Sequence, residues 1–529
     1  MLPSSRVNST KEVHEAYARR LTEATNAMVS NYSAIIKSLK IEDDSRLTST
    51  NQAFQDNYEA NVRCTNIIKA GQSLLTLISD LKECLIFKDF PAINQNLSNQ
   101  KDLLEQNKDM MNSEVDKIKE EMSEVAWTRC FQHGSTNCNI DVTQYYNNGA
   151  ACAGWRDNLV KRIEEGMVKL ESGLKNGGFK KGDYTIYSGT SGLALLYLRL
   201  SETLYVNNPT KRRQALERAL ELITQPLNKL NGRRLTFLCG DGGVLALGAV
   251  LYTLCDNRAV ARHCTQGLQT LSDLALTDKL MPKELMYGCA GYLFALLFTR
   301  KYLPESIDNR LIARVAAHII SVGKEEAKWT SGATLLYTWH EKHYLGAAHG
   351  VAGILYTLLQ SGVVSSQELN ATVAPSVNYL LSQRYSSNNL PSSLSSQLDQ
   401  LVQWCHGAPG FVPLLTETHQ HLQGGVYLQE AIKCATPIWQ RGLLRKGHGL
   451  CHGTLGNAYA FLDLYQRTED PTWLSKAVHF AEWSMSQKDV AKTYENEMKL
   501  FDGLAGVIYF YCDMLEPKSA AFPGFQVPK

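Results

Sequence analysis

Seven pairs of glycines, each with the spacing Gly-x-x-Gly, recur along the C-terminal part of this 529-residue chain. Successive pairs begin between 46 residues (Gly407 to Gly453) and 62 residues (Gly288 to Gly350) apart. The pairs are Gly189/Gly192, Gly240/Gly243, Gly288/Gly291, Gly350/Gly353, Gly407/Gly410, Gly453/Gly456 and Gly503/Gly506. A period of this length indicates one small structural unit repeated seven times.

Each glycine pair opens a helical stretch that is apolar on all sides, such as VLALGAVLYTL from residue 244. A more amphipathic helix lies between copies, as in WLSKAVHFAEWSMSQ at 473–487. A helix that is apolar all round must be buried, so seven two-helix units predict a closed ring of inner helices wrapped by outer ones. We therefore expect an all-α domain over residues 156–529. Its loops and helix N-termini should converge at one end, where a ligand would bind.

The first 125 residues follow a different pattern, with polar sequence and narrow apolar stripes at helical spacing. One stripe runs from Leu21 to Leu39, a second from Ile67 to Leu85, and a third from Leu104 to Val125. The third stripe has the spacing of a coiled-coil seam. These stripes predict a long-helix hairpin or coiled-coil segment that needs a partner, either another helix pair or the rest of the chain. Residues 126–155 turn to Gly, Asn, Thr and Cys and indicate a junction.

Charge and hydropathy narrow the classes of partner. The net charge is +2, which provides no basic field for direct nucleic-acid binding. The sequence contains no apolar run of about 18 residues, so we expect no transmembrane segment. The first residues lack the features of a secretory signal, and thirteen cysteines then favour reduced thiols inside the cell.

Two copies of the repeat, QWCHGAPG and GLCHGTLG, place Cys-His before the first glycine, and a third, GAAHG, places a histidine there. Equivalent positions in a closed ring face one central space, so these five side chains can approach one point. They are Cys405, His406, Cys451, His452 and His349. Two thiolates with one imidazole form a strong zinc set and leave a fourth position open. Buried cysteines and histidines without a metal are the alternative.

The N-terminal strings QDNYE, KAGQSL and SDLKECLIFKDFP resemble the core of Mediator subunit 22, a helical head-module subunit of the RNA polymerase II coactivator. The resemblance covers roughly residues 11–124. It implies a helical bundle with head-module subunit 11, a part in transcription regulation and a nuclear location, and it implies no catalysis.

The C-terminal strings FLCGDGG, ELMYGCAGYLFALLF, GAAHGVAGI, QWCHGAPG, GHGLCHGTLGNAYAFL and LFDGLAG follow the order of eukaryotic LanC-like proteins, relatives of the bacterial lanthionine synthetase cyclases. The resemblance covers about residues 156–525 and implies a seven-fold α/α toroid. It also implies a zinc ion held by Cys405, Cys451 and His452, with His406 as a neighbour rather than a ligand. This part implies a cytoplasmic location.

The resemblance further implies that zinc activates a thiol, such as that of glutathione, for addition to dehydroamino acids in peptides or proteins. His349 matches a family histidine that acts as acid or base, and Lys446 matches a basic residue that would meet a glutathione carboxylate. A solvated side chain is the alternative for Lys446. Two family arginines lack a counterpart: the junction replaces the N-terminal arm that supplies one, and QKDVAKTYENEMK (487–499) contains none.

Three interpretations remain open at this point. The chain is a two-part protein with a Mediator-type segment and a thiol-adding enzyme, or a catalytically silent scaffold, or the product of two neighbouring genes joined in one gene model. Sequencing the transcript across Trp127 to Trp155 decides the last of these.

Overall fold

The structure is a computed structural model that describes residues 10–38, 50–87, 101, 108, 129–131, 140–180, 182–422, 425–487 and 498–529. The chain divides into two compact units, residues 1–117 and 118–529. Within the described ranges, no helix combines the length and the apolar character that crossing a membrane requires.

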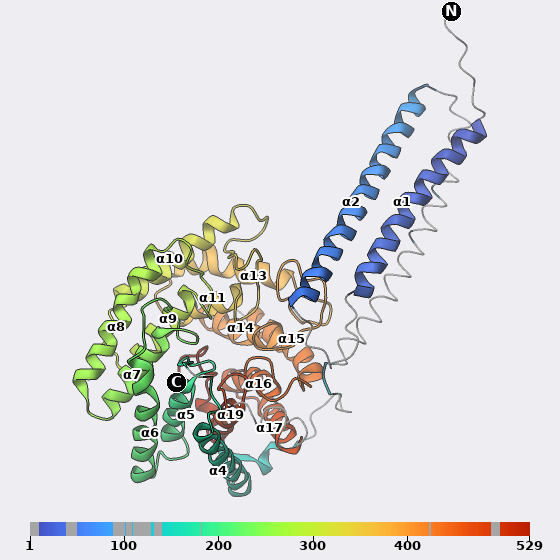
Figure 1. Cartoon of the computed structure of the whole chain (residues 1–529). Coiled ribbons are helices and arrows are strands. Elements are labelled where there is room, and N and C mark those ends of the chain that lie inside the picture. Colours follow the sequence, from blue (N-terminus) through green and yellow to red (C-terminus); the bar gives the residue numbers. More distant parts are fainter. Residues whose placement is uncertain are drawn as a thin grey trace, which may run out of the picture. The chain divides into compact units, whose positions relative to one another are not determined.

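The first unit contains two long helices, α1 (Thr10–Ser38) and α2 (Thr50–Phe87), which pack side by side as a hairpin (Figure 1). Arg20 of α1 and Asp80 of α2 form an ion pair of 2.7 Å between Nη1 and Oδ2. The first two helices expected from the apolar stripes are therefore present. The third stripe, from Leu104 to Val125, lies outside the described residues apart from residue 108.

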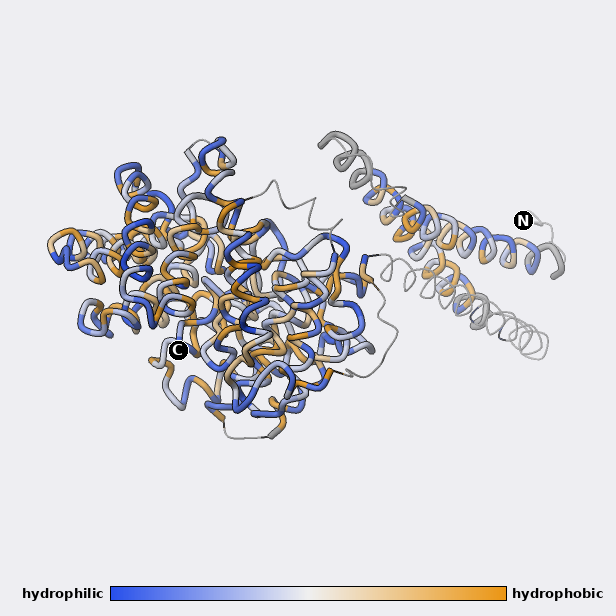
Figure 2. The backbone as a smooth tube through the Cα atoms, turned by 90° about the horizontal axis from the view of Figure 1, so that it is seen from below, coloured by the Kyte–Doolittle hydropathy of each residue, from blue (hydrophilic) through white to orange (hydrophobic). Residues whose placement is uncertain are grey.

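The hairpin buries little apolar surface. The buried apolar side chains described in it are those of Ala24, Ala70 and Leu77, while Ile68 is 62% and Leu75 is 67% exposed. Figure 2 shows hydrophilic and hydrophobic stretches alternating along both helices. A two-helix unit with large exposed aliphatic side chains presents a surface that a partner could cover.

The second unit is a ring of inner helices with a second layer of helices outside it (Figure 1). The inner helices are α5 (Thr190–Glu202), α7 (Asp241–Leu254), α9 (Cys289–Tyr302), α11 (Val351–Gln360), α14 (Ala408–Leu422), α16 (Thr454–Thr468) and α19 (Leu504–Leu515). The outer helices are α4 (Ala153–Lys175), α6 (Pro209–Leu227), α8 (Arg258–Thr277), α10 (Asn309–Ala327), α13 (Ala374–Ser382), α15 (Gly425–Arg441) and α17 (Pro471–Ser486). The predicted all-α fold is confirmed, with fourteen ring helices among the described residues.

The ring closes where the last inner helix returns to the first. Helix α19 contacts α5. It also meets α16 through Tyr459 and Phe510, whose ring centroids lie 5.2 Å apart, and the Tyr459 hydroxyl donates a hydrogen bond of 2.8 Å to Asp513. The inner helices are buried on all sides, as their composition requires: every residue of α9 from Cys289 to Thr299 is buried.

Short elements connect and precede the ring. They are η1 (Val142–Gln144), the hairpin of β1 (Tyr146–Asn147) and β2 (Ala150–Ala151), α12 (Ser366–Glu368), the π-helical turn η2 (Leu369–Val373) that continues into α13, and η3 (Pro517–Ser519). The first three lie in the predicted junction of residues 126–155, and α4 already begins inside that range, at Ala153.

The glycine pairs are required by space rather than by backbone angle. Gly453, which caps α16, has φ of −118°, a value open to any residue. At the second glycine of the same pair, Gly456, an added Cβ would overlap the carbonyl oxygen of Leu450. Gly407 is different, because its φ of +111° strongly favours glycine. The loop thus folds back tightly on the entry of its helix.

Several neighbouring loops are linked by backbone hydrogen bonds at the residue two places before the first glycine. Tyr187 N–H donates to Leu238 (2.9 Å), and Phe501 N–H donates to Tyr187 (3.2 Å). Cys451 N–H donates to Phe501 (3.1 Å), and Cys405 N–H donates to Cys451 (3.2 Å). These bonds hold the loops of neighbouring repeats at fixed spacing, so side chains from distant parts of the sequence meet.

Candidate active site

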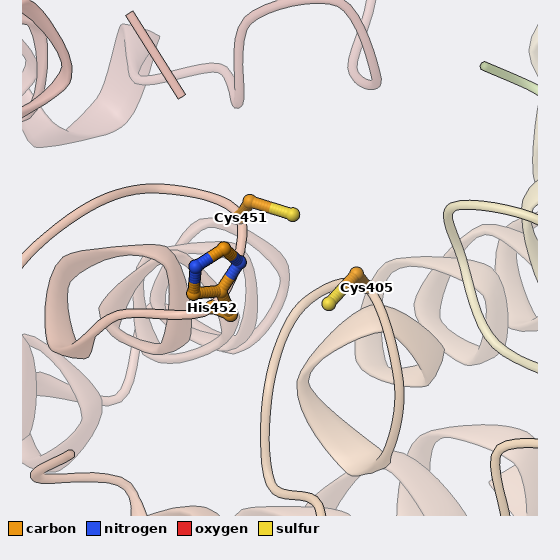
Figure 3. Close-up of side chains that lie close together, drawn as sticks. All are labelled: Cys405, Cys451 and His452. Atoms are coloured by element: carbon orange, nitrogen blue, oxygen red, sulfur yellow. The ribbon is translucent and has the colours of Figure 1, made fainter. Parts of the chain in front are cut away.

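Three of the predicted site residues come together at the end of the toroid that is formed by the loops before the inner helices. Cys405 lies in the loop before α14, and Cys451 and His452 lie in the loop before α16 (Figure 3). Their potential ligand atoms, two Sγ atoms and one imidazole nitrogen, all lie within 4.8 Å of one another. His406 does not belong to this group, although its local sequence matches that of His452.

The donor set and its spacing fit a zinc ion. Tetrahedral zinc, with bonds of about 2.3 Å to sulfur and about 2.0 Å to nitrogen, separates its ligand atoms by roughly 3.5 to 3.8 Å. Shifts of under about 1 Å would therefore bring all three atoms to one ion. The surroundings disfavour an uncompensated thiolate: the hydrogen bond with Cys405 and burial raise the pKa of the Cys451 thiol well above its usual range. A divalent cation offsets the cost of two buried thiolates.

A carboxylate stands behind the histidine of this group. Asp502 Oδ1 lies 3.5 Å from His452 Nδ1, and it accepts a hydrogen bond of 3.3 Å from the Tyr187 hydroxyl. Asp502 occupies the same place in the seventh repeat that His452 occupies in the sixth, directly before the first glycine. A carboxylate near a ligating imidazole restricts its orientation and raises its basicity.

His349 is held by a buried glutamate. Its Nδ1 lies 2.9 Å from Glu284 Oε2, and the Glu284 side chain is 2% exposed. The same carboxylate accepts backbone hydrogen bonds from Met286 (2.7 Å) and Tyr287 (2.5 Å). A carboxylate fixed by these bonds and facing Nδ1 favours the tautomer in which Nδ1 donates a hydrogen bond to it.

His406 and Lys446 lie in the electrostatic surroundings of the same group. Burial, together with nearby His349, Lys446 and His452, lowers the pKa of His406 to about 4, so this imidazole is neutral at physiological pH. The ring centroids of His349 and His406 are 6.3 Å apart. Lys446 is exposed. The six predicted residues thus occupy one end of the ring, with the three possible ligands as a compact subset.

The junction pairs with the chain segment that directly precedes Lys446. Phe131 N–H donates to Leu443 (2.7 Å), and Arg445 N–H donates to Arg129 (3.0 Å), so residues 129–131 pair with residues 443–445. The Arg445 guanidinium lies 4.5 Å from the centroid of the Phe131 ring. Arg129 is therefore opposite Arg445, the chain neighbour of Lys446. The arginine-free stretch 487–499 lies outside the described residues between 488 and 497.

Three residues around the ligand group and His349 were not predicted from the sequence: Glu284, Asp502 and Tyr187. Two of them had a signal in the repeat itself, because Tyr187 and Asp502 stand two places and one place before a first glycine, as Cys405 and His406 do. Glu284 precedes its glycine by four residues and has no equivalent in the Cys-His copies.

Comparisons with known proteins identify the class of the toroid. Residues 180–527 match the family model of the lanthionine synthetase C-like proteins, and the chain belongs to this family. Residues 19–124 match the model described as Surfeit locus protein 5 subunit 22 of Mediator complex. Both resemblances inferred from the sequence are thereby confirmed.

Individual relatives match the toroid. The Danio rerio protein named glutathione S-transferase LANCL1 is 39% identical over 377 residues, which are 70% of this chain and 91% of that protein. The Arabidopsis thaliana LanC-like protein GCL1 is 33% identical over 392 residues, covering 70% of this chain and 87% of that protein. The solved structure of nisin cyclase shares the fold, with a TM-score of 0.53 at 16% identity, over 68% of this chain and 94% of that one.

Proposed function

We propose that the toroid is a zinc-dependent enzyme that adds the thiol of glutathione to dehydroamino-acid residues in peptides or proteins. The observation that carries the proposal is the group of Cys405, Cys451 and His452 at one end of the ring, which also holds the His349–Glu284 pair. The name of the Danio rerio relative, a glutathione S-transferase, supports glutathione as the thiol.

The addition involves no oxidation or reduction and no leaving group, so it needs only an activated nucleophile and a proton carrier. A zinc ion held by the three ligands would supply a Lewis acid that lowers the pKa of a thiol at its open position. A sulfur–carbon bond forms at the β-carbon of the dehydro residue as its carbon–carbon π bond breaks, and the α-carbon takes up one proton. The proton lost by the thiol balances the one gained. His349 Nε2 is the atom placed to carry it, since Glu284 occupies Nδ1.

The positive charge of Lys446 acts on His406 and His452 and suits a carboxylate of glutathione. Lys446 precedes Cys451 by five residues and is exposed, and Arg129 and Arg445 are paired next to it through their backbones. We assign Lys446 to glutathione binding, because charge-assisted hydrogen bonds to carboxylates favour such a side chain.

Metal analysis tests the zinc site directly. The purified full chain should contain one zinc ion, and Cys451→Ala should lose most of it. Cys434→Ala is the matched control, because Cys434 is also fully buried but lies in the outer helix α15. Absence of zinc from the wild type, or equal zinc in Cys451→Ala and wild type, contradicts the proposed site.

Mass spectrometry of a dehydroalanine peptide incubated with glutathione then tests the reaction. A zinc-loaded chain that forms no adduct would favour the scaffold interpretation.

For the first unit we propose a second function, as a Mediator head-module segment in the nucleus. The exposed aliphatic side chains of α2, among them Ile68 and Leu75, are the observation that favours it. They suit a partner helix pair of the head-module subunit 11 type. Co-purification of the full chain with that subunit is expected, and its failure would leave the hairpin without this role.

Transcript sequencing across Trp127 to Trp155 tests whether both units occur in one protein.

A further inference from the structure

Three planar side chains form a row that starts at His349. The ring of Tyr287 lies 6.0 Å from that of His349 with 9° between the planes. The ring of Trp339 lies 6.0 Å from that of Tyr287 with 25° between the planes. We call Trp339, Tyr287 and His349 the aromatic row.

The aromatic row is partly exposed. Near-parallel rings with centroids 6.0 Å apart are offset and overlap only in part. Tyr287 is 45% exposed, and Trp339 is half-buried. Aromatic side chains held side by side and left partly open are suited to bind another flat or apolar group.

Each ring is fixed in place by its own contacts. Glu284 holds His349, and the Tyr287 hydroxyl is hydrogen-bonded to the Cys239 sulfur. Trp339 is the first residue of a tight turn in which it exchanges backbone hydrogen bonds of 2.9 and 3.0 Å with Lys342. Because the three side chains of the row are already fixed, few of them become newly ordered when a ligand binds. The loss of conformational entropy on binding is therefore small.

The turn itself is strained. Its central residues, His340 and Glu341, have φ of 46° and 60°, in the left-handed region that usually takes Asn and Gly in a two-residue turn. Neither is glycine, so the turn costs roughly 1 kcal/mol per residue. Such strain is retained where surrounding structure fixes it, and it is common at binding sites.

We propose that the aromatic row is the subsite for the acceptor peptide, and that it selects a flat aromatic side chain two residues away from the dehydro residue. This inference rests on the proposed function. In an extended peptide, side chains on one face recur every second residue, about 6.8 Å apart. That repeat is close to the 6.0 Å step of the row. A dehydro residue beside His349 therefore brings the side chain two residues along the chain to Tyr287, the ring next to Trp339.

Binding measured without reaction tests the subsite independently of catalysis. Fluorescein-labelled dehydroalanine peptides, with Phe one, two or three residues from the dehydroalanine, are titrated with the full-length zinc-loaded protein without glutathione. Fluorescence anisotropy gives the Kd. We expect the tightest binding with Phe at two residues, and Trp339→Ala should weaken it roughly five- to tenfold. Trp339→Phe should retain most of the affinity.

A matched control and a second readout separate the possible failures. Trp329→Ala makes the same change at a side chain that is 92% exposed and should leave the Kd unchanged. Zinc content must be equal in all variants, which excludes a collapsed site. With glutathione added, Trp339→Ala should raise KM for the Phe-containing peptide and leave kcat and the KM for glutathione unchanged.

The outcomes distinguish the subsite from the reaction. Adduct formation by the wild type, with equal Kd for wild type and Trp339→Ala, overturns the subsite and leaves the proposed function standing. Trp339-dependent binding with no adduct overturns the proposed function and retains the peptide subsite. Equal affinity for all three Phe positions overturns the register.

Discussion

In the proposed mechanism, Glu284 determines which nitrogen of His349 exchanges a proton. Its carboxylate lies 2.9 Å from Nδ1 and is nearly fully buried. Glu284→Gln removes the charge and lets the imidazole adopt either tautomer. We expect kcat for glutathione addition to fall roughly 100-fold, with unchanged KM for glutathione and unchanged zinc content.

Glu284→Asp is the conservative comparison for this prediction, because it keeps the charge. It should recover part of the activity lost in Glu284→Gln. Equal kcat in the wild type and the Gln variant would mean that His349 needs no fixed tautomer, and the assignment of Nε2 as the proton carrier would be wrong.

His448 couples stability to pH. Its side chain is 3% exposed, both ring nitrogens lack a hydrogen-bond partner within the described ranges, and burial lowers its pKa to about 4. The imidazole titrates near pH 6.5 in the unfolded chain. Between these two pKa values the unfolded state binds the proton and the folded state does not. The contribution of neutral His448 to the free energy of unfolding is therefore complete above about pH 6.5, and it is lost as the pH falls toward 4.

The variant His448→Phe removes this titration. The difference in unfolding free energy between the variant and the wild type should shift in favour of the variant by on the order of 3 kcal/mol between pH 7 and pH 4. Urea midpoints measured across this range give the difference. A difference that does not change with pH would show that His448 is protonated equally in both states.

Individual residues show how far local sequence predicts a site. Cys405 and Cys451 could be found because a repeat places them in equivalent loops, and the structure brings their sulfur atoms together. Glu284 and His349 lie 65 residues apart in sequence. Their contact depends on the three-dimensional register of neighbouring loops, which no local pattern encodes.

At the scale of one element, the loop entering α16 depends on Gly456. An added Cβ would overlap the Leu450 carbonyl, directly before Cys451. Gly456→Ala should therefore move the ligand loop, destabilise the toroid by roughly 1 to 3 kcal/mol, and reduce zinc content. Thermal unfolding and metal analysis measure both effects. Gly154→Ala in α4 is the control, since no atom lies within 4 Å of its added Cβ; similar losses in both variants would refute the steric explanation.

The helices of the ring were predictable because the same pattern, a glycine pair followed by an apolar helical stretch, recurs seven times. The buried helices follow from their continuous apolar sequence, and α9 is an example. The pairing of residues 129–131 with residues 443–445 was not predictable, because three residues without periodicity meet a partner more than 300 positions away. From the sequence, the junction was expected to replace the N-terminal arm of the family. In the structure, Arg129 of the junction lies opposite Arg445.

At the scale of the whole molecule, two units with different physical character share one chain. The toroid buries its apolar side chains in a closed ring, and the hairpin leaves several of its own exposed. The sequence predicted both units from periodicity alone. Their family assignments came from specific strings, because periodicity cannot tell one helical hairpin from another.

If both proposed functions belong to one protein, mutations should separate them. Ile68→Glu with Leu75→Glu places two charges on exposed aliphatic positions of α2. A helix partner would then have to desolvate these charges, so co-purification with a subunit 11-like partner should be lost, while adduct formation and zinc content stay at wild-type levels. Lys69→Glu, an exposed polar position on the same helix, is the control and should retain the partner. Retained partner binding in the double variant would show that this face of α2 is not the interface.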